Sequence, residues 1–313
     1  MNLRDLRYIV AVADFGHFGR AAEACNVTQP TLSGQIRKLE EELGLAIFER
    51  VGHTVRPTAP GGQILDHARR ALAAAEDIVS VAASARDPLA GPLHLGVIPT
   101  LGPYLMPYAL PAAQQGLRAL RLVLVEDLTV RLIELVAAGK LDAAIIASDP
   151  ETPALQMETL FDEDFWLVLD GDNPLAARNK ITIADIDPQS LLLLTDGHCL
   201  RDQALELCGP PRDAEAAIAD MRATSLKTLL HMAAAGYGMT LFPALALRQE
   251  EPLPGNLVAR RLSGTKARRR VRLIFRPSHP RRAAIAALSK LIRASVKDVL
   301  EKENEAAFAG VES

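Results

Sequence analysis

The chain is poor in cysteine and in aromatic residues. Its 313 residues include three cysteines and one tryptophan, and aromatic residues make up 4% of the total. So few cysteines in a chain of this length exclude the disulfide framework of a small secreted domain. Acidic and basic residues nearly balance, 38 against 35. The overall charge therefore gives no argument for binding to nucleic acid.

Long apolar runs are missing too. No run approaches the ~20 residues that a membrane span needs, and the first seven residues lack the apolar segment of a secretory signal. No metal-ligand spacing, phosphate-binding glycine loop or Ser/His/Asp motif stands out, so we expect no metal and no cofactor. Apolar residues still make up 49% of the chain, enough for a sizeable core. We expect a soluble cytoplasmic protein of two or three domains.

Three short helices are predicted at the N-terminus. Apolar residues recur at helical spacing from Leu3 to Ala13, and a second helix is predicted over 20–25. Thr28 is a good N-cap for a third helix, in which Pro30 suits the first turn. One apolar stripe of that helix should face inward, formed by Leu32, Ile36, Leu39 and Leu43.

The opposite face of the third helix is polar. A short helix, a turn and a helix with a polar face form the helix-turn-helix arrangement, whose second helix can enter a major groove. Residues 45–56 predict a small β-hairpin wing with two arginines that can meet phosphates. An ordinary solvated face on three packed helices fits the spacing equally well. The candidate DNA-binding residues are Thr28, Gln29, Pro30, Thr31, Ser33, Gln35, Arg37, Lys38, Arg50 and Arg56.

The charge of this module argues against tight binding by one copy. Residues 1–58 carry seven basic and seven acidic residues. The basic residues must then form a local patch, with Glu40, Glu41 and Glu42 facing away from it. Because phosphate contacts supply much of the affinity for DNA, we expect the protein to bind at least as a dimer.

Three N-terminal segments resemble the signature of LysR-type transcriptional regulators. They are residues 20–24, 28–40 and 43–50, and the match is nearly ungapped. The resemblance implies a winged helix-turn-helix module, a linker helix that pairs two subunits, and a C-terminal effector-binding domain. Promoter DNA is the implied partner, and a contact with RNA polymerase is expected.

A long helix and then an alternating pattern follow. Residues 63–85 carry a continuous apolar stripe, which favours a dimerisation helix over a buried core helix. From Gly91 the alternation of strands and helices predicts an α/β fold with a mostly parallel sheet. Strands are predicted at 93–98, 120–126, 143–147, 165–169, 191–195, 239–242 and 269–275, and helices at 104–115, 130–138, 226–235 and 282–299.

Two similar α/β subdomains resemble the periplasmic-binding-protein-like regulatory domain of the LysR family. In such sheets a ligand lies beyond the carboxyl ends of the strands. Thr100, Thr129 and Ser225 are expected there, the first two just after a strand and each at the start of a helix. The implied division is a DNA-binding domain 1–59, a linker 60–88, a regulatory domain 91–301 (subdomain I 91–161 and 268–301, subdomain II 162–267) and a tail 302–313.

Two cysteines share one predicted short helix, Cys199 in its first turn and Cys208 in its last. A thiol at a helix N-terminus is favoured as thiolate, and His198 and Arg201 could add positive charge. Peroxide oxidises a thiolate to sulfenic acid, and a second thiol then forms a disulfide. Nine helical residues span ~13 Å, but a disulfide needs Cα atoms within ~7 Å. The bond therefore requires the helix to unravel. Two buried, inert cysteines are the alternative.

The segment around Cys199 also resembles the redox loop of the hydrogen-peroxide-sensing members of the LysR family. The likeness implies that Cys199 is the peroxidatic residue and Cys208 the resolving one. Three further residues would hold peroxide near the thiol, and an arginine would supply charge to the thiolate. They are Thr100, Thr129, His198 and Arg269; the run of arginines at 268–270 lets the last assignment slip by one. Cys25 has no redox role by this likeness and is expected in the core.

Three hypotheses for the function remain open. The preferred one is a peroxide-responsive activator of antioxidant genes, a homodimer or homotetramer on promoter DNA that rearranges when Cys199 and Cys208 join. The second is a LysR-type regulator that binds a small metabolite between the subdomains, with incidental cysteines. The third is a thiol peroxidase, against which the lack of a Cys-x-x-Cys motif argues.

Overall fold

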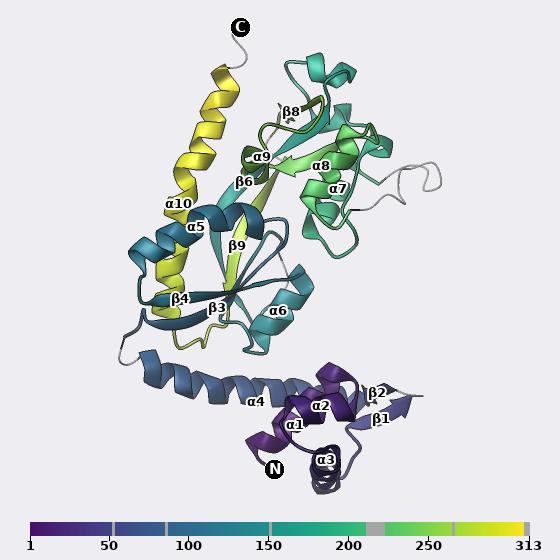
Figure 1. Ribbon diagram of the computed structural model, residues 1–313, viewed down its shortest axis with the longest axis vertical. Helices are drawn as coiled ribbons and strands as arrows, with labels where there is room; N and C mark the ends of the chain where they lie inside the picture. The colour runs from purple at the N-terminus through teal and green to yellow at the C-terminus, as the bar shows by residue number, and fades with distance from the viewer. Residues whose placement is uncertain (52–53, 85–86, 150–151, 211–222, 265–266, 310–313) are drawn as a thin grey trace. The chain divides into compact units, whose positions relative to one another are not determined.

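The chain folds into two compact units. The computed structural model describes residues 1–51, 54–84, 87–149, 152–210, 223–264 and 267–309 (Figure 1). The first unit comprises Met1–Arg86 with Ala137–Lys140, and the second comprises Asp87–Val136 and Leu141–Ser313. None of the helices in the described ranges combines the length and hydropathy that a membrane span requires.

The N-terminal unit has the predicted three helices and wing. The elements are α1 (Leu3–Phe15), α2 (Phe18–Ala24), α3 (Gln29–Leu43), β1 (Phe48–Val51) and β2 (Thr54–Pro57). Thr28 caps α3 by accepting a hydrogen bond from Thr31 N–H, with Pro30 in the first turn. Apolar residues of the three helices and the wing pack into one core cluster. Leu43 was wrongly placed in the inward stripe: it is exposed, because α3 ends there at Gly44.

Helix α4 (Ala59–Ser84) begins four residues earlier than predicted. Leu65 and Ala68 are buried in the same cluster as α1–α3. Farther along the helix the apolar stripe is uncovered, since Ile78 and Val79 are 71% and 70% exposed. The N-terminal part of α4 thus completes the core of this unit, and its C-terminal part offers an apolar surface.

The second unit is built on a seven-stranded sheet. Its order is β4-β3-β5-β9-β6-β7, with β8 paired to β6. The strands are β3 (Gly91–Val97), β4 (Leu120–Glu126), β5 (Ala143–Ile146), β6 (Gln156–Asp170), β7 (Thr240–Pro243), β8 (Leu257–Arg261) and β9 (Arg268–Phe275). Among the strand pairs of the described residues, β3–β4 and β3–β5 are parallel and the other four are antiparallel. The expectation of a mostly parallel sheet was wrong, because β6 and β9 run antiparallel to their neighbours.

Strand β6 carries the chain from one part of the sheet to the other. Residues 156–164 pair with β9, whereas Phe165–Asp170 pair with β7 and β8. The sequence predicted only the apolar second half of this strand, since acidic residues interrupt the alternation in the first half. The predicted strand 191–195 was also wrong. Leu191 and Leu194 make only isolated bridges, to Met239 and Ala223.

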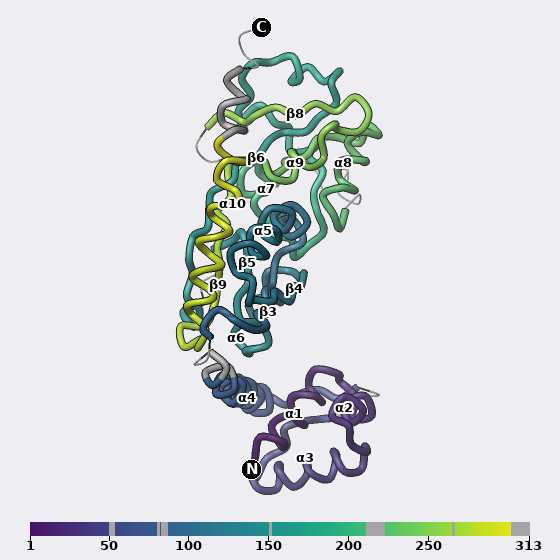
Figure 2. The backbone as a smooth tube through the Cα atoms, turned by 60° about the vertical axis from the view of Figure 1, so that its left-hand side comes forward, coloured from purple at the N-terminus to yellow at the C-terminus, as the bar shows by residue number. Residues whose placement is uncertain are grey.

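The helices of the second unit cover this sheet. They are α5 (Gly102–Gly116), α6 (Thr129–Ala137), α7 (Cys199–Cys208), α8 (Leu226–Ala234), α9 (Ala244–Gln249) and α10 (Arg282–Ala309). Ser225 caps α8 as predicted, accepting a hydrogen bond from Thr228 N–H at 3.2 Å. Figures 1 and 2 both show α10 running beside β9 and β6 and against α5, which it contacts. The last helix extends ten residues beyond its predicted end.

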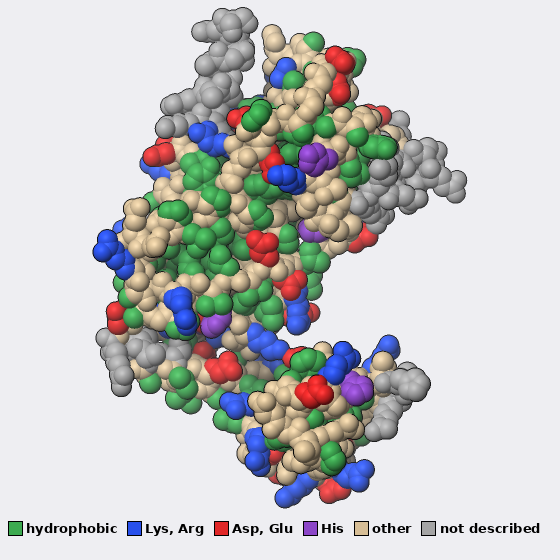
Figure 3. Space-filling model, viewed as in Figure 1, with side chains coloured by type: hydrophobic (Ala, Val, Ile, Leu, Met, Phe, Trp, Pro, Cys, Tyr) green, Lys and Arg blue, Asp and Glu red, His purple; other side chains and the backbone are tan. Residues whose placement is uncertain are grey.

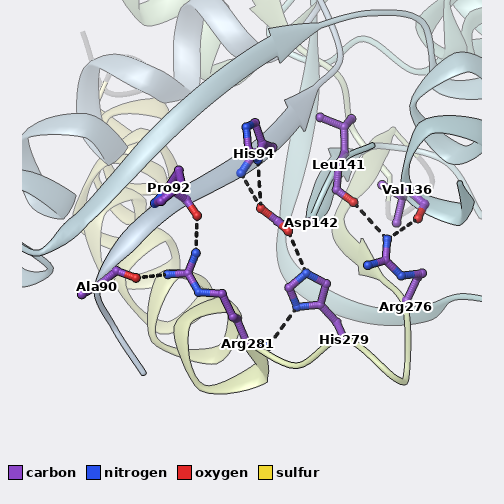
Figure 4. Close-up of polar contacts among 9 residues, drawn as sticks. All are labelled: Ala90, Pro92, His94, Val136, Leu141, Asp142, Arg276, His279 and Arg281. Carbon is purple, nitrogen blue, oxygen red and sulfur yellow. Dashed lines mark hydrogen bonds and ion pairs between the residues drawn. The ribbon is translucent and has the colours of Figure 1, made fainter. Parts of the chain in front are cut away.

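A polar cluster ties the first strand of this unit to the segment before α10 (Figure 4). Asp142 accepts a hydrogen bond from His279 Nε2 at 2.8 Å, and another from a backbone N–H of β3 at 2.6 Å. His279 Nδ1 accepts from Arg281 N–H, so Nε2 is the ring nitrogen that donates to Asp142. The Arg281 guanidinium in turn donates to the carbonyls of Ala90 and Pro92. These bonds hold the chain where it enters the sheet.

Candidate functional site

Three hydroxyl residues follow three neighbouring strands. Because β4, β3 and β5 are adjacent and parallel, their carboxyl ends meet at one edge of the sheet. Thr100 follows β3, Thr129 follows β4 and Ser148 follows β5. The hydroxyls of Thr129 and Ser148 are buried, and within the described residues neither makes a hydrogen bond of normal geometry. This edge of the sheet therefore carries two buried hydroxyls whose hydrogen-bonding capacity is not used within the described residues.

Helix α7 packs its first turns against the same edge. Gln203 donates a hydrogen bond from Nε2 to Ala147 O, at the end of β5. The turn before α7 is equally close, since a Cβ built on Gly197 lies 2.9 Å from Leu128 Cδ1. Gly197 has a φ of +91°, which other residues rarely adopt. The turn therefore needs glycine both for its conformation and for its approach to the segment before Thr129.

Cys199 is the first residue of α7 and is buried, 8% exposed. The hydroxyl of Thr129 and the charge of Arg269 both lower the pKa of its thiol. Since Thr129 makes no hydrogen bond of normal geometry, we interpret its effect as that of a nearby polar group. The structure thus brings two of the predicted site residues, Thr129 and Arg269, close to the sulfur of Cys199.

Arg269 belongs to a buried ion pair. Its Nε donates to Glu163 Oε2 at 2.7 Å, and both side chains are fully buried. The other guanidinium nitrogens donate to Thr100, one to Oγ1 and one to the carbonyl, each at 3.2 Å. Arg268 and Arg270 point the other way and pair with Asp164 and Asp162. The alternation of β9 selects Arg269 as the inward residue.

The thiol of Cys199 differs from the sequence-based expectation of a stabilised thiolate. Burial raises its pKa, and this outweighs the lowering by Arg269 and Thr129. Arg269 is also partly neutralised by Glu163, so it acts on the sulfur as one end of an ion pair. In this conformation the protonated thiol is the favoured form.

Two other expected charge donors do not act as predicted. His198 is buried, and burial lowers its pKa, so its ring is neutral near pH 7. Arg201 forms an ion pair with Asp196 at 2.6 Å, and Asp202 lies 3.8 Å away. Thr100, moreover, does not open a helix. It lies in a turn two residues before α5, and its hydroxyl accepts from Arg269 instead of capping.

Cys208 is the last residue of α7, as predicted. It is partly buried, and burial raises its pKa to about 11. All three cysteines are free thiols, and Cys25 is partly buried against the N-terminal core. With α7 intact, Cys199 and Cys208 are ~13 Å apart along the helix, too far for a disulfide. The structure therefore has the reduced arrangement.

The predicted DNA-binding residues lie on one helix and the wing. Gln29, Pro30, Thr31, Arg37 and Lys38 are exposed on α3, Ser33 and Gln35 are partly buried, and Arg56 is exposed on β2. Arg50 lies in β1, but its side chain is outside the described residues. Glu40 does not simply face away: its carboxylate accepts hydrogen bonds from the backbone N–H groups of Ile47 and Phe48, at 2.7 and 3.2 Å. It thereby holds the start of the wing on α3.

Comparison with known proteins decides the family. Residues 3–62 match the helix-turn-helix of the bacterial regulatory proteins of the lysR family, and residues 86–297 match the LysR substrate binding domain. The chain belongs to the LysR family. A hydrogen peroxide-inducible genes activator of Escherichia coli O6:H1 is 42% identical over 305 residues, which cover 96% of this chain and 98% of that protein.

Two solved structures are similar to this LysR-family chain over most of its length. One is full-length OxyR from Pseudomonas aeruginosa with an aspartate in place of a cysteine (TM-score 0.73, 38% identity, 94% of this chain and 98% of that one). The other is a cysteine-to-serine mutant of Corynebacterium glutamicum OxyR with bound hydrogen peroxide. Its TM-score is 0.66 at 34% identity, over 96% of this chain and 94% of that one.

Three residues of this LysR site were missed by sequence reasoning. Ser148 could have been found, because it follows a predicted strand as Thr100 and Thr129 do. Gln203 lies one helical turn after Cys199 and therefore on the same face of α7. Nothing in the sequence around Glu163 marks it as a site residue. Only the register of β6 with β9 places it opposite Arg269.

Proposed function

We propose that this LysR-family chain is a transcriptional activator that senses hydrogen peroxide through Cys199 and Cys208. The observation that carries the proposal is the position of Cys199. Cys199 is buried in the first turn of α7, which packs against the carboxyl end of β5 through Gln203, and the hydroxyl of Thr129 and the charge of Arg269 act on its thiol. A relative named as a hydrogen peroxide-inducible genes activator, 42% identical, supports the same function.

The proposed chemistry balances as a two-electron oxidation. The sulfur of Cys199 attacks one peroxide oxygen, the O–O bond breaks, and a sulfenic acid forms while water leaves after protonation. The thiolate of Cys208 then attacks the sulfenic sulfur, so that an S–S bond forms and the second oxygen leaves as water. Two thiols are oxidised and one peroxide is reduced to two waters.

Residues around Cys199 have distinct proposed roles in this step. The hydroxyl of Thr100 accepts from Arg269, so its own proton can be donated to a peroxide oxygen. Thr129 has a free hydroxyl that can bind the other oxygen. His198, neutral and buried, would shield the site and offer one ring nitrogen. Arg269 would stabilise negative charge as the sulfur attacks and hydroxide leaves.

Disulfide formation would remodel the regulatory unit. With α7 intact the two cysteines cannot join, so the bond requires loss of the helix. Leu200 and Ala204, now 3% and 4% exposed, would leave their buried positions. Ala204 and Cys208 contact the core beneath the β6–β8 part of the sheet, so we expect the change to extend into that core.

We also propose that copies of this chain assemble with one another. Figure 3 shows apolar side chains gathered over α5 and the neighbouring strands, where Leu110 and Leu124 are 40% and 37% exposed. Together with the exposed stripe of α4, this surface would hold a homodimer or a homotetramer on promoter DNA. We also propose a contact with RNA polymerase and a cytoplasmic location, since an activator works where promoters are transcribed.

The decisive experiment replaces Cys199 by serine. Cys199→Ser should still bind promoter DNA, but its footprint should no longer change on addition of peroxide. Cys25→Ser is the matched control and should respond as the unmodified protein does. Cys208→Ser should give a weakened or altered response, because sulfenic acid alone can distort α7. A footprint of the Cys199→Ser protein that still changed with peroxide would refute the mechanism.

Two measurements separate this function from the alternatives. Thiol trapping with mass spectrometry after micromolar peroxide should show one Cys199–Cys208 bond, whereas a metabolite-binding regulator would keep its thiols. Peroxide consumption should stop at one equivalent per subunit. Repeated turnover with a thioredoxin-like donor would indicate a peroxidase instead.

A further inference from the structure

Glu163 is a buried carboxylate with no role in the redox steps proposed for Cys199. It lies in β6 directly opposite Arg269 of β9, and its side chain is fully buried. Each of its oxygens accepts one short hydrogen bond. Oε2 accepts from Arg269 Nε and Oε1 from the backbone N–H of Leu245, both at 2.7 Å. The carboxylate is therefore held from both sides.

The bond from Leu245 anchors Glu163 to a packed helix. Leu245 lies in the first turn of α9, where a backbone N–H has no acceptor within the helix itself. Glu163 supplies that acceptor. Because Leu245 is fully buried, a turn of the carboxylate away from it would leave the N–H without a partner at a cost in free energy. Helix α9 contacts both α5 and β7, so the anchor is fixed in turn.

The guanidinium of Arg269 passes this order on to Thr100. With Nε bound to Glu163, the other two nitrogens donate to Oγ1 and to the carbonyl of Thr100, each at 3.2 Å. A guanidinium carries donors only. The Thr100 hydroxyl must therefore accept from Arg269, and its own proton is directed elsewhere.

We infer that Glu163 is a positioning residue: through Arg269 it fixes the Thr100 hydroxyl as a donor to peroxide and so makes Cys199 selective for peroxide over other electrophiles. This role rests on the proposed peroxide chemistry of Cys199. When the sulfur bonds to one peroxide oxygen, the O–O bond breaks and hydroxide leaves, so a fixed donor and a nearby positive charge stabilise the developing charge. Alkylation by iodoacetamide releases iodide and needs no such donor.

Glu163→Gln tests the inference because an amide cannot accept on both sides. With its oxygen toward Leu245, its NH2 group faces the guanidinium of Arg269, and the opposite orientation sets NH2 against the Leu245 N–H. The measurement is the rate constant for oxidation of Cys199 by hydrogen peroxide divided by that for its alkylation by iodoacetamide. Both reactions use the thiolate, so the ratio does not depend on the thiolate fraction. In the full-length reduced protein at pH 7, we expect the ratio to fall at least tenfold.

Two further variants show whether the effect passes through Thr100. Glu158→Gln is the matched control, since Glu158 also lies in β6 but pairs with Arg293 of α10, and it should change the ratio less than twofold. Thr100→Val removes the donor hydroxyl and should lower the ratio by itself. Adding Glu163→Gln to Thr100→Val should then change the ratio less than twofold, because both residues act through one hydroxyl.

The outcomes separate this role from its alternatives. A ratio in Glu163→Gln within twofold of the unmodified protein would overturn the inference, and so would effects of Glu163→Gln and Thr100→Val that multiply. An equal fall in Glu158→Gln would reduce the effect to general destabilisation. If Glu163→Gln does not fold, Glu163→Asp keeps the charge but withdraws the carboxylate by one methylene, and an unchanged ratio there would also overturn the inference. Oxidation of Cys199 no faster than that of Cys25 in the unmodified protein would instead contradict the proposed function itself.

Discussion

Replacing Ala204 by glycine should make the proposed disulfide easier to form. Ala204 lies in the middle of α7 and is 4% exposed in the core beneath the sheet. In the reduced protein, glycine costs about 1 kcal/mol of helix stability and about 0.8 kcal/mol for the buried methyl. If oxidation unravels α7, neither penalty applies to the oxidised form. The reduced form alone is then destabilised, by roughly 2 kcal/mol.

The substitution should shift the reduction potential of the Cys199–Cys208 pair. Destabilising the reduced form makes the reduction potential more negative. For a two-electron couple about 1.4 kcal/mol corresponds to 30 mV, so the shift should be ~40 mV. The assay equilibrates the full-length protein in glutathione buffers, traps the thiols with an alkylating reagent, and weighs the products by mass spectrometry.

A matched control separates this effect from general destabilisation. Ala233→Gly makes the same change in α8, where the side chain is fully buried. It should lower the melting temperature but leave the reduction potential within about 10 mV. A potential that did not move in Ala204→Gly, or moved in the positive direction, would refute the idea that α7 is lost on oxidation.

Three further predictions concern the thiol and the DNA face. Because burial raises the pKa of Cys199, its thiolate fraction and its rate of oxidation by peroxide should rise about tenfold per pH unit between pH 6 and 8. An oxidation rate that did not change with pH would contradict this. Glu163→Gln removes the counter-charge of Arg269, so it should lower the pKa of Cys199 at some cost in melting temperature. The rate of Cys199 alkylation, measured against pH, should then rise at a lower pH than in the unmodified protein. An unchanged pH dependence would mean that Arg269 does not act on the thiol. Arg56→Ala should weaken DNA binding similarly for all sequences and reduce the salt slope by about one, and a loss confined to one promoter would show base contact instead.

Local signals predicted the helices of the N-terminal unit and of the redox segment. Thr28 and Pro30 mark the start of α3 because a side-chain oxygen can cap it and a missing N–H costs nothing there. Ser225 likewise marks the start of α8, because its side-chain oxygen caps that helix. The spacing from Cys199 to Cys208 matches α7 residue by residue. Caps and helical periodicity are properties of neighbouring residues, so no tertiary information is needed to detect them.

Strand pairing could not be predicted in the same way. The acidic first half of β6 has no apolar alternation, because its carboxylates pair with arginines on β9 instead of facing a core. The segment 191–195 has the composition of a buried strand but makes only isolated bridges. The subdomain boundaries stay a prediction, since β6 runs through the proposed division between residues 161 and 162, whereas β9 begins at the other one.

By itself, the sequence determined the winged helix-turn-helix, the family likeness and the helix that holds Cys199 and Cys208 apart. Only the tertiary structure decided the electrostatics of the thiol. Helix position and neighbouring basic residues favour thiolate, but burial, which depends on segments distant in the sequence, has the larger effect. The same holds for Arg269. Three consecutive arginines are equivalent in the sequence, and only the register of β9 with β6 buries one of them against Glu163.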